Sequence, residues 1–145
     1  MPKRTARTAW NGSLQTGSGQ VELSSSKVGT YDVSFPKRAA DEAGGTTSPE
    51  ELIAAAHSAC FAMQLSNDIA EAGGTPQSLE VTADVNLGPD TAGGFRLTGI
   101  TLTVRAEVGG LDEAAVLKVA DEAKATCPVS KALTGVEITL DAALV

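Results

Sequence analysis

The motif SPEELIAAAHSACFAMQL constrains the fold more than any other part of the chain. Ser48 is a favourable N-cap, Pro49 suits the first helical position, and Glu51 completes a capping box. The helix is expected to cover residues 51–72 and to stop at Gly73–Gly74. Its first half is apolar nearly all round, which is typical of a buried helix at the centre of a fold rather than of a surface helix.

Strand-like segments with alternating apolar residues surround this helix. The order of elements is strands, helix, strands, helix, strand, which predicts an α+β fold with a mostly antiparallel sheet. Residues 36–48 are expected to form a polar loop. The other expected strands cover residues 5–14, 17–35, 78–87, 95–110 and 135–144, and the other expected helices cover residues 111–126 and 128–133.

The composition is that of a single globular domain using all of residues 1–145. Apolar residues make up 42% of the chain, but aromatic residues only 3%, so the core must be built from smaller side chains. A second copy of the chain could supply the missing burial, which favours a homodimer. The formal net charge of −7 disfavours nucleic acid and anionic membranes as partners.

The first residues, MPKRTARTAWNGSLQ, have no apolar stretch after their basic residues, as a secretory signal would require. No segment has the length and apolarity of a membrane span. We therefore expect a cytoplasmic protein. In that compartment a cysteine pair is more often redox-active or metal-binding than a structural disulfide.

The chain has two cysteines, Cys60 in the central helix and Cys127 just before Pro128. Cys60 could be a small core residue, because free cysteine is among the most buried residue types. Cys127 is expected to be the N-cap of a short helix, where the helix dipole would favour its thiolate, although it could also simply end the preceding helix. The two cysteines lie 67 residues apart and form no CxxC unit, and with a single histidine they make zinc binding improbable.

His57 precedes Cys60 by three residues, so both side chains project from about the same face of the helix. His57 could polarise the thiol, as in a cysteine hydrolase, or it could be a satisfied, partly buried histidine. No sequence feature marks the orienting residue or the oxyanion hole that a hydrolase would also need.

The segments TTSPEELIAAAHSACFAMQL, CPVSKAL and ITLDAAL together resemble the family of osmotically inducible protein C and the organic hydroperoxide resistance proteins. The resemblance runs along essentially the whole chain, and AAHSACF is closer to the osmotically inducible branch. It implies a cysteine-based thiol peroxidase that reduces organic hydroperoxides to alcohols, with hydrogen peroxide as a further candidate substrate. It implies an intertwined homodimer with active sites at the interface, in which strands of residues 1–46 are exchanged or packed across the dimer. It implies no bound cofactor or metal, but an external dithiol reductant.

The resemblance also assigns roles to individual residues. Cys60 matches the peroxidatic cysteine, Cys127 the resolving cysteine, Arg38 the catalytic arginine and Glu50 its partner, with Lys37 as an alternative cation beside Arg38. The side chains expected to line the substrate pocket are His57, Ile53, Phe61 and Met63.

Helix geometry suggests that each site draws groups from both subunits. Glu50 and Cys60 are ten residues apart, about 15 Å along a straight helix. Arg38 of the same chain could therefore hardly pair with Glu50 and contact Cys60 at once, so we expect Arg38 and Glu50 of one chain to meet Cys60 of the other. The rival interpretations are a non-enzymatic dimeric binding or structural protein, and a hydrolase using Cys60 and His57.

Overall fold

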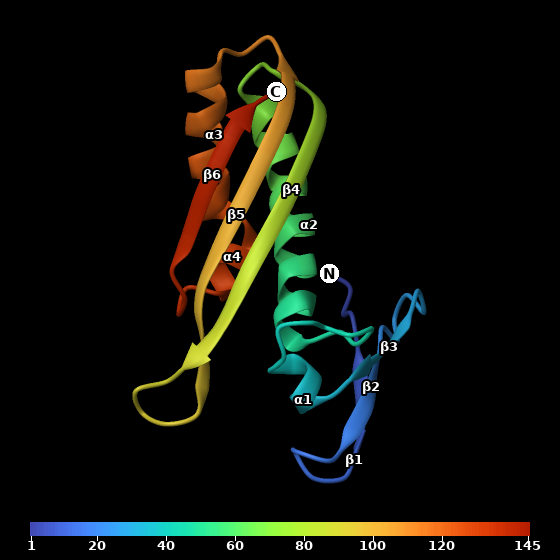
Figure 1. The fold of residues 1–145 in the computed structure, drawn as a ribbon. Helices are drawn as coiled ribbons and strands as arrows, with labels where there is room; N and C mark the ends of the chain where they lie inside the picture. Colours follow the sequence, from blue (N-terminus) through green and yellow to red (C-terminus); the bar gives the residue numbers. More distant parts are fainter. The chain divides into compact units, whose positions relative to one another are not determined.

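The computed structural model describes all of residues 1–145, and the chain divides into two compact units, Met1–Pro49 and Glu50–Val145. The first unit contains a three-stranded antiparallel sheet in the order β1-β2-β3 (Figure 1). The strands are β1 (Arg7–Asn11), β2 (Ser18–Glu22) and β3 (Thr30–Val33). In the middle of the sheet Val21 pairs with a residue on each side and is buried, as the alternation of this segment predicts.

A short helix, α1 (Phe35–Arg38), follows β3, so the prediction of a polar loop from residue 36 was wrong at its start. Ser34 is the N-cap of this helix, and its hydroxyl accepts a hydrogen bond of 3.3 Å from the backbone N–H of Lys37. Pro36 lies in the first turn, where its fixed φ suits a helix and its missing N–H costs nothing. This one turn positions Lys37 and Arg38 at its C-terminal end.

The long helix α2 (Pro49–Glu71) is the feature that the sequence predicts best. It begins at the expected proline and ends at the expected glycines. The N–H of Gly73 bonds to the carbonyl of Ala70, and the N–H of Gly74 bonds to that of Ile69. With Gly73 at φ 90°, this is the Schellman arrangement that ends a helix at a left-handed residue.

The second unit is built on a hairpin of two long antiparallel strands, β4 (Thr75–Pro89) and β5 (Phe95–Gly109). The last strand, β6 (Ile138–Leu144), pairs with β5 in parallel. A parallel neighbour needs a crossover connection, and here α3 (Glu113–Thr126) and α4 (Pro128–Ala132) provide it (Figure 1). The fold is thus α+β with mostly antiparallel pairing, as predicted, but with two separate sheets and one parallel pair.

One face of the second sheet packs against α2 and α3 to form the core. The buried residues of β5 alternate along the strand, whereas those of α2 recur every four residues from His57 to Ile69, so each element turns a single face toward the core. The buried core residues are Phe61, Leu65, Ile69, Leu102, Val104, Ala106, Val119, Ala120, Ala123 and Cys127. The core therefore includes Cys127, one of the two cysteines.

We predict that Leu65→Ala will lower the free energy of unfolding by about 3 kcal/mol, because Leu65 is 0% exposed and truncation leaves a cavity. Urea denaturation at one fixed protein concentration measures this change. Leu117→Ala on α3 is a matched control, since Leu117 is 38% exposed and should cost less than about 1 kcal/mol. Equal losses for the two variants would contradict the described core.

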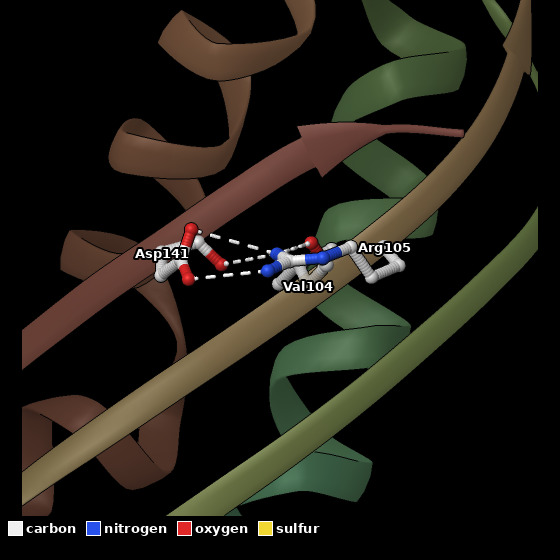
Figure 2. A network of polar contacts seen from close by, with 3 residues as sticks. All are labelled: Val104, Arg105 and Asp141. Atoms are coloured by element: carbon white, nitrogen blue, oxygen red, sulfur yellow. Dashed lines mark hydrogen bonds and ion pairs between the residues drawn. The ribbon is translucent and has the colours of Figure 1, made fainter.

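The opposite face of the sheet carries polar side chains. Figure 2 shows Arg105 of β5 reaching Asp141 of β6, with 3.2 Å between Arg105 Nη2 and Asp141 Oδ2. Arg105 Nη1 also donates to the carbonyl of Val104 at 2.8 Å. Both charged side chains are substantially exposed, so the ion pair contributes little stability, but it marks this face as the outer one.

Candidate active site

Cys60 and Cys127 meet at the end of the core. The two sulfur atoms are 3.3 Å apart, and both cysteines are free thiols. Cys60 comes from the middle of α2 and is partly buried, whereas Cys127 comes from the junction of α3 and α4 and is 0% exposed. Two thiols in contact from separate elements are placed to exchange a proton or to form a disulfide.

The junction that holds Cys127 follows from its sequence. Cys127 ends α3, with its N–H bonded to the carbonyl of Ala123, and it is also the N-cap of α4. Pro128 disfavours helical geometry at the preceding residue, so Cys127 leaves the helical region with ψ 124° and the chain turns there. The predicted N-cap position of Cys127 is thereby confirmed.

The surroundings of Cys127 favour its thiolate. Burial acts to raise the pKa of this thiol, but the N–H and hydroxyl of Ser130, the Cys60 thiol and the N–H of Val129 together hold that pKa below its usual value. The Cys127 sulfur makes no capping hydrogen bond of full geometry. Several polar groups close to the Cys127 sulfur therefore lower its pKa together, without one well-formed hydrogen bond to that sulfur.

The surroundings of Cys60 act in the opposite sense. Burial raises the pKa of the Cys60 thiol, the N–H of Val129 opposes this, and the hydrogen bond and negative charge of Cys127 raise it further. No arginine or lysine of the second unit is among the groups that shift it. Within this unit the surroundings therefore lower the pKa of Cys127 and raise that of Cys60.

His57 is fully buried, and its Nε2 lies 2.7 Å from the hydroxyl oxygen of Ser130. Its Nδ1 is buried without any hydrogen-bond partner. Neither ring nitrogen bonds to Cys60, so the arrangement lacks the nucleophile–base contact that a Cys60–His57 hydrolase would need.

The other side chains expected around the substrate lie in different environments. Phe61 is 0% exposed in the core, Met63 is 74% exposed, and Ile53 is intermediate. Positions 61 and 63 lie on nearly opposite sides of a helix, so Phe61 and Met63 do not share one wall of α2. A substrate pocket formed by His57, Ile53, Phe61 and Met63 stays a prediction.

The predicted charged residues belong to different units. Glu50 lies in the first turn of α2 and is buried at 8% exposed, while Arg38 is the last residue of α1 in the first unit. A buried carboxylate needs a cationic or N–H partner. The pairing of Glu50 with Arg38, and the choice between Arg38 and Lys37, stay predictions.

Sequence reasoning missed Ser130. This residue is 5% exposed, and its hydroxyl connects His57 to the neighbourhood of Cys127. His57 and Ser130 are 73 positions apart, so no local pattern joins them. The only available signal was a polar residue three positions after a cysteine at a helix start.

Comparison with known proteins identifies the family. The family model described as OsmC-like protein matches residues 41–141. The peroxiredoxin OsmC of Escherichia coli K12 is 44% identical over 132 residues, which are 91% of this chain and 90% of that protein. The chain belongs to the OsmC family.

Two further relatives place the chain within that family. The organic hydroperoxide resistance protein-like 2 of Staphylococcus epidermidis ATCC 12228 is 34% identical over 116 residues, or 76% of this chain and 77% of that protein. The crystal structure of the organic hydroperoxide resistance protein OhrB of Bacillus subtilis matches with a TM-score of 0.75 and 30% identity, covering 95% and 97% of the two chains. The higher identity to OsmC confirms the predicted branch.

None of the helices of this OsmC-family chain is both long and apolar enough to cross a bilayer.

Proposed function

We propose that this protein is a thiol-dependent peroxidase that reduces organic hydroperoxides to alcohols. The contact of 3.3 Å between the Cys60 and Cys127 sulfurs, in a chain of the OsmC family, carries this proposal. A non-enzymatic binding or structural protein would gain nothing from two free thiols in contact. The names of the relatives, a peroxiredoxin and organic hydroperoxide resistance proteins, support the same chemistry.

The proposed reaction has two steps at these sulfurs. The Cys60 thiolate attacks the terminal peroxide oxygen, the O–O bond breaks, and the released alkoxide takes a proton to become the alcohol. Cys60 is thereby oxidised by two electrons to a sulfenic acid. Cys127 then attacks the Cys60 sulfur, a disulfide forms, and the sulfenate oxygen leaves as water. An external small or protein dithiol reduces the disulfide, so no resident cofactor is needed.

The first step needs a group that the second unit does not supply. Cys60 must ionise to attack, but its surroundings in that unit raise its pKa. A guanidinium within about 4–6 Å would lower it and would stay charged throughout. We assign this role to Arg38, oriented by Glu50, and place both on the chain opposite Cys60 in a homodimer.

An intact-mass measurement tests the peroxidase function. One equivalent of tert-butyl hydroperoxide should remove two hydrogens per chain, about 2 Da, as the Cys60–Cys127 disulfide forms, with release of one equivalent of tert-butanol. Excess dithiothreitol should restore the original mass. An unchanged mass and intact hydroperoxide after several minutes would rule the function out.

Mixing two inactive variants tests whether each site is shared between subunits. Arg38→Ala and Cys60→Ser homodimers should each be inactive. A heterodimer pairs the intact Cys60 of one chain with the intact Arg38 of the other and should regain one site. An equal mixture, refolded together, should recover about one quarter of wild-type turnover, since about half the dimers are mixed and each has one working site.

Lys37→Ala is the matched control for this experiment, because Lys37 is adjacent to Arg38 in α1. It should retain turnover as a homodimer. Turnover lost in Lys37→Ala but kept in Arg38→Ala would transfer the role to Lys37. Failure of the mixture to recover activity would place Arg38 and Cys60 of a working site on the same chain.

A further inference from the structure

His57 and Ser130 form a buried polar pair next to the two sulfurs, and the proposed peroxidase reaction does not use it. The ring nitrogen Nε2 and the serine oxygen are 2.7 Å apart, and the residues are 0% and 5% exposed. His57 lies on α2, which also carries Cys60. Ser130 lies on α4, the helix that follows Cys127. The pair therefore connects the two elements directly beside the thiols.

The single hydroxyl proton of Ser130 decides which way it bonds to His57. Ser130 is the third residue after Cys127, in the helix that Cys127 caps, and its hydroxyl acts to lower the pKa of Cys127 when its proton is turned toward that sulfur. It has no second proton for His57, so it must accept a hydrogen bond from the Nε2–H of that ring. In this tautomer Nδ1 carries only a lone pair, which agrees with the absence of any partner at Nδ1.

The same geometry keeps the imidazole neutral. Burial lowers the pKa of His57, and a protonated ring would place a second N–H at Nδ1, where no acceptor lies. A neutral ring with its proton on Nε2 is a fixed donor. It holds the Ser130 oxygen in place and leaves the hydroxyl proton free to point toward Cys127.

We propose that His57 and Ser130 are positioning residues for the resolving cysteine, aligning one hydroxyl proton with the Cys127 sulfur so that this sulfur attacks oxidised Cys60 as a thiolate. This inference rests on the proposed peroxidase function, since only that reaction gives Cys127 an oxidised partner. Neither ring nitrogen of His57 bonds to Cys60, and in this scheme the His57–Ser130 pair acts through Cys127.

The resolving step is balanced as follows. Cys127 gives up its thiol proton, and the resulting thiolate is stabilised by the Ser130 hydroxyl. Its electron pair forms the S–S bond while the S–O bond of the Cys60 sulfenic acid breaks. The departing hydroxide takes up one proton, which balances the proton lost by Cys127, and becomes water. The product is the Cys60–Cys127 disulfide. The oxidant for its formation is the hydroperoxide that was consumed in the first step.

Direct titration of Cys127 tests the pair without any peroxide. In full-length protein carrying Cys60→Ser, Cys127 is the only cysteine, so the pH dependence of the ultraviolet absorbance of the thiolate reports the pKa of Cys127 alone. Adding Ser130→Ala should raise that pKa by about one unit, because a hydrogen bond to the charged form is lost. Ser130→Thr keeps a hydroxyl and should restore most of the shift. Ser78→Ala, the same change at an exposed position of β4, should have no effect.

The histidine is tested by substitutions that keep or remove its donor. His57→Gln can present an amide N–H near the position of Nε2, whereas His57→Leu presents none. We expect His57→Leu to shift the Cys127 pKa as Ser130→Ala does, and His57→Gln to shift it much less. If His57→Leu does not fold, the comparison of Ser130→Ala with Ser130→Thr still decides the proposal.

A single-turnover experiment with Cys60 present then links the pair to the second step. After one equivalent of tert-butyl hydroperoxide, Ser130→Ala should form the disulfide about tenfold more slowly than wild type, while dimedone-trapped sulfenic acid accumulates. Wild-type titration of Cys127 and wild-type disulfide formation in Ser130→Ala would overturn the proposal. If the wild-type chain consumed no hydroperoxide, the peroxidase function would fail instead, and the titration would still measure the effect of the pair on Cys127.

Discussion

Replacing Cys60 by serine is expected to abolish peroxidase turnover, with a loss of at least about a thousandfold. A serine hydroxyl stays protonated at neutral pH and is a poor nucleophile toward an O–O bond, whereas a thiolate is a good one. The measurement is the consumption of tert-butyl hydroperoxide at saturating dithiothreitol. The change is almost isosteric at a partly buried position, so the fold should persist and circular dichroism can verify it.

The matched control is the same substitution at the neighbouring sulfur. If Cys60→Ser retained wild-type turnover while Cys127→Ser lost it, the two roles would be exchanged. The structure gives a reason to test for this exchange, because the surroundings in the second unit lower the pKa of Cys127. Normal turnover in both variants would rule out thiol chemistry altogether.

The second large effect is expected for Cys127→Ser. This variant should reduce one equivalent of hydroperoxide and then stop cycling normally, because the sulfenic acid on Cys60 has no thiol beside it. Further peroxide should convert Cys60 to sulfinic and sulfonic acids, with mass gains of about 32 and 48 Da. Intact mass spectrometry over a series of peroxide concentrations measures this conversion.

The wild-type chain under the same conditions is the control and should show loss of two hydrogens rather than gain of oxygen. Cys127 would not be the resolving residue if the variant and the wild type accumulated these acids to the same extent.

The sequence predicted the elements of the fold well where local chemistry decides them. The Ser48-Pro49 start and the Gly73–Gly74 stop define α2 without reference to any other part of the chain, and the structure confirms both ends. The β4–β5 hairpin follows from alternation around a glycine-rich turn in the same way. The short helix α1 was missed because four residues are too few for a periodic pattern, although Ser34 and Pro36 are its start signals.

Contacts between segments that are far apart in the chain could not be predicted from the sequence. The last strand was expected, but its parallel pairing with β5 depends on the crossover through α3 and α4. The contact between Cys60 and Cys127 was expected only through resemblance to a family, because 67 intervening residues leave its geometry open. No sequence pattern joins His57 to Ser130, since the position of Ser130 three residues after Cys127 says nothing about a residue 73 positions away.

The closeness of the two sulfurs has a kinetic consequence. Sulfur atoms that already stand 3.3 Å apart need no large rearrangement before they react. Capture of an oxidised Cys60 would then be a first-order event whose rate is independent of how much oxidant surrounds the molecule. Destructive further oxidation is second-order and accelerates with oxidant concentration. At low oxidant concentration Cys60 would therefore be protected from over-oxidation. Over-oxidation would prevail only where collision with a second oxidant molecule becomes faster than formation of the disulfide.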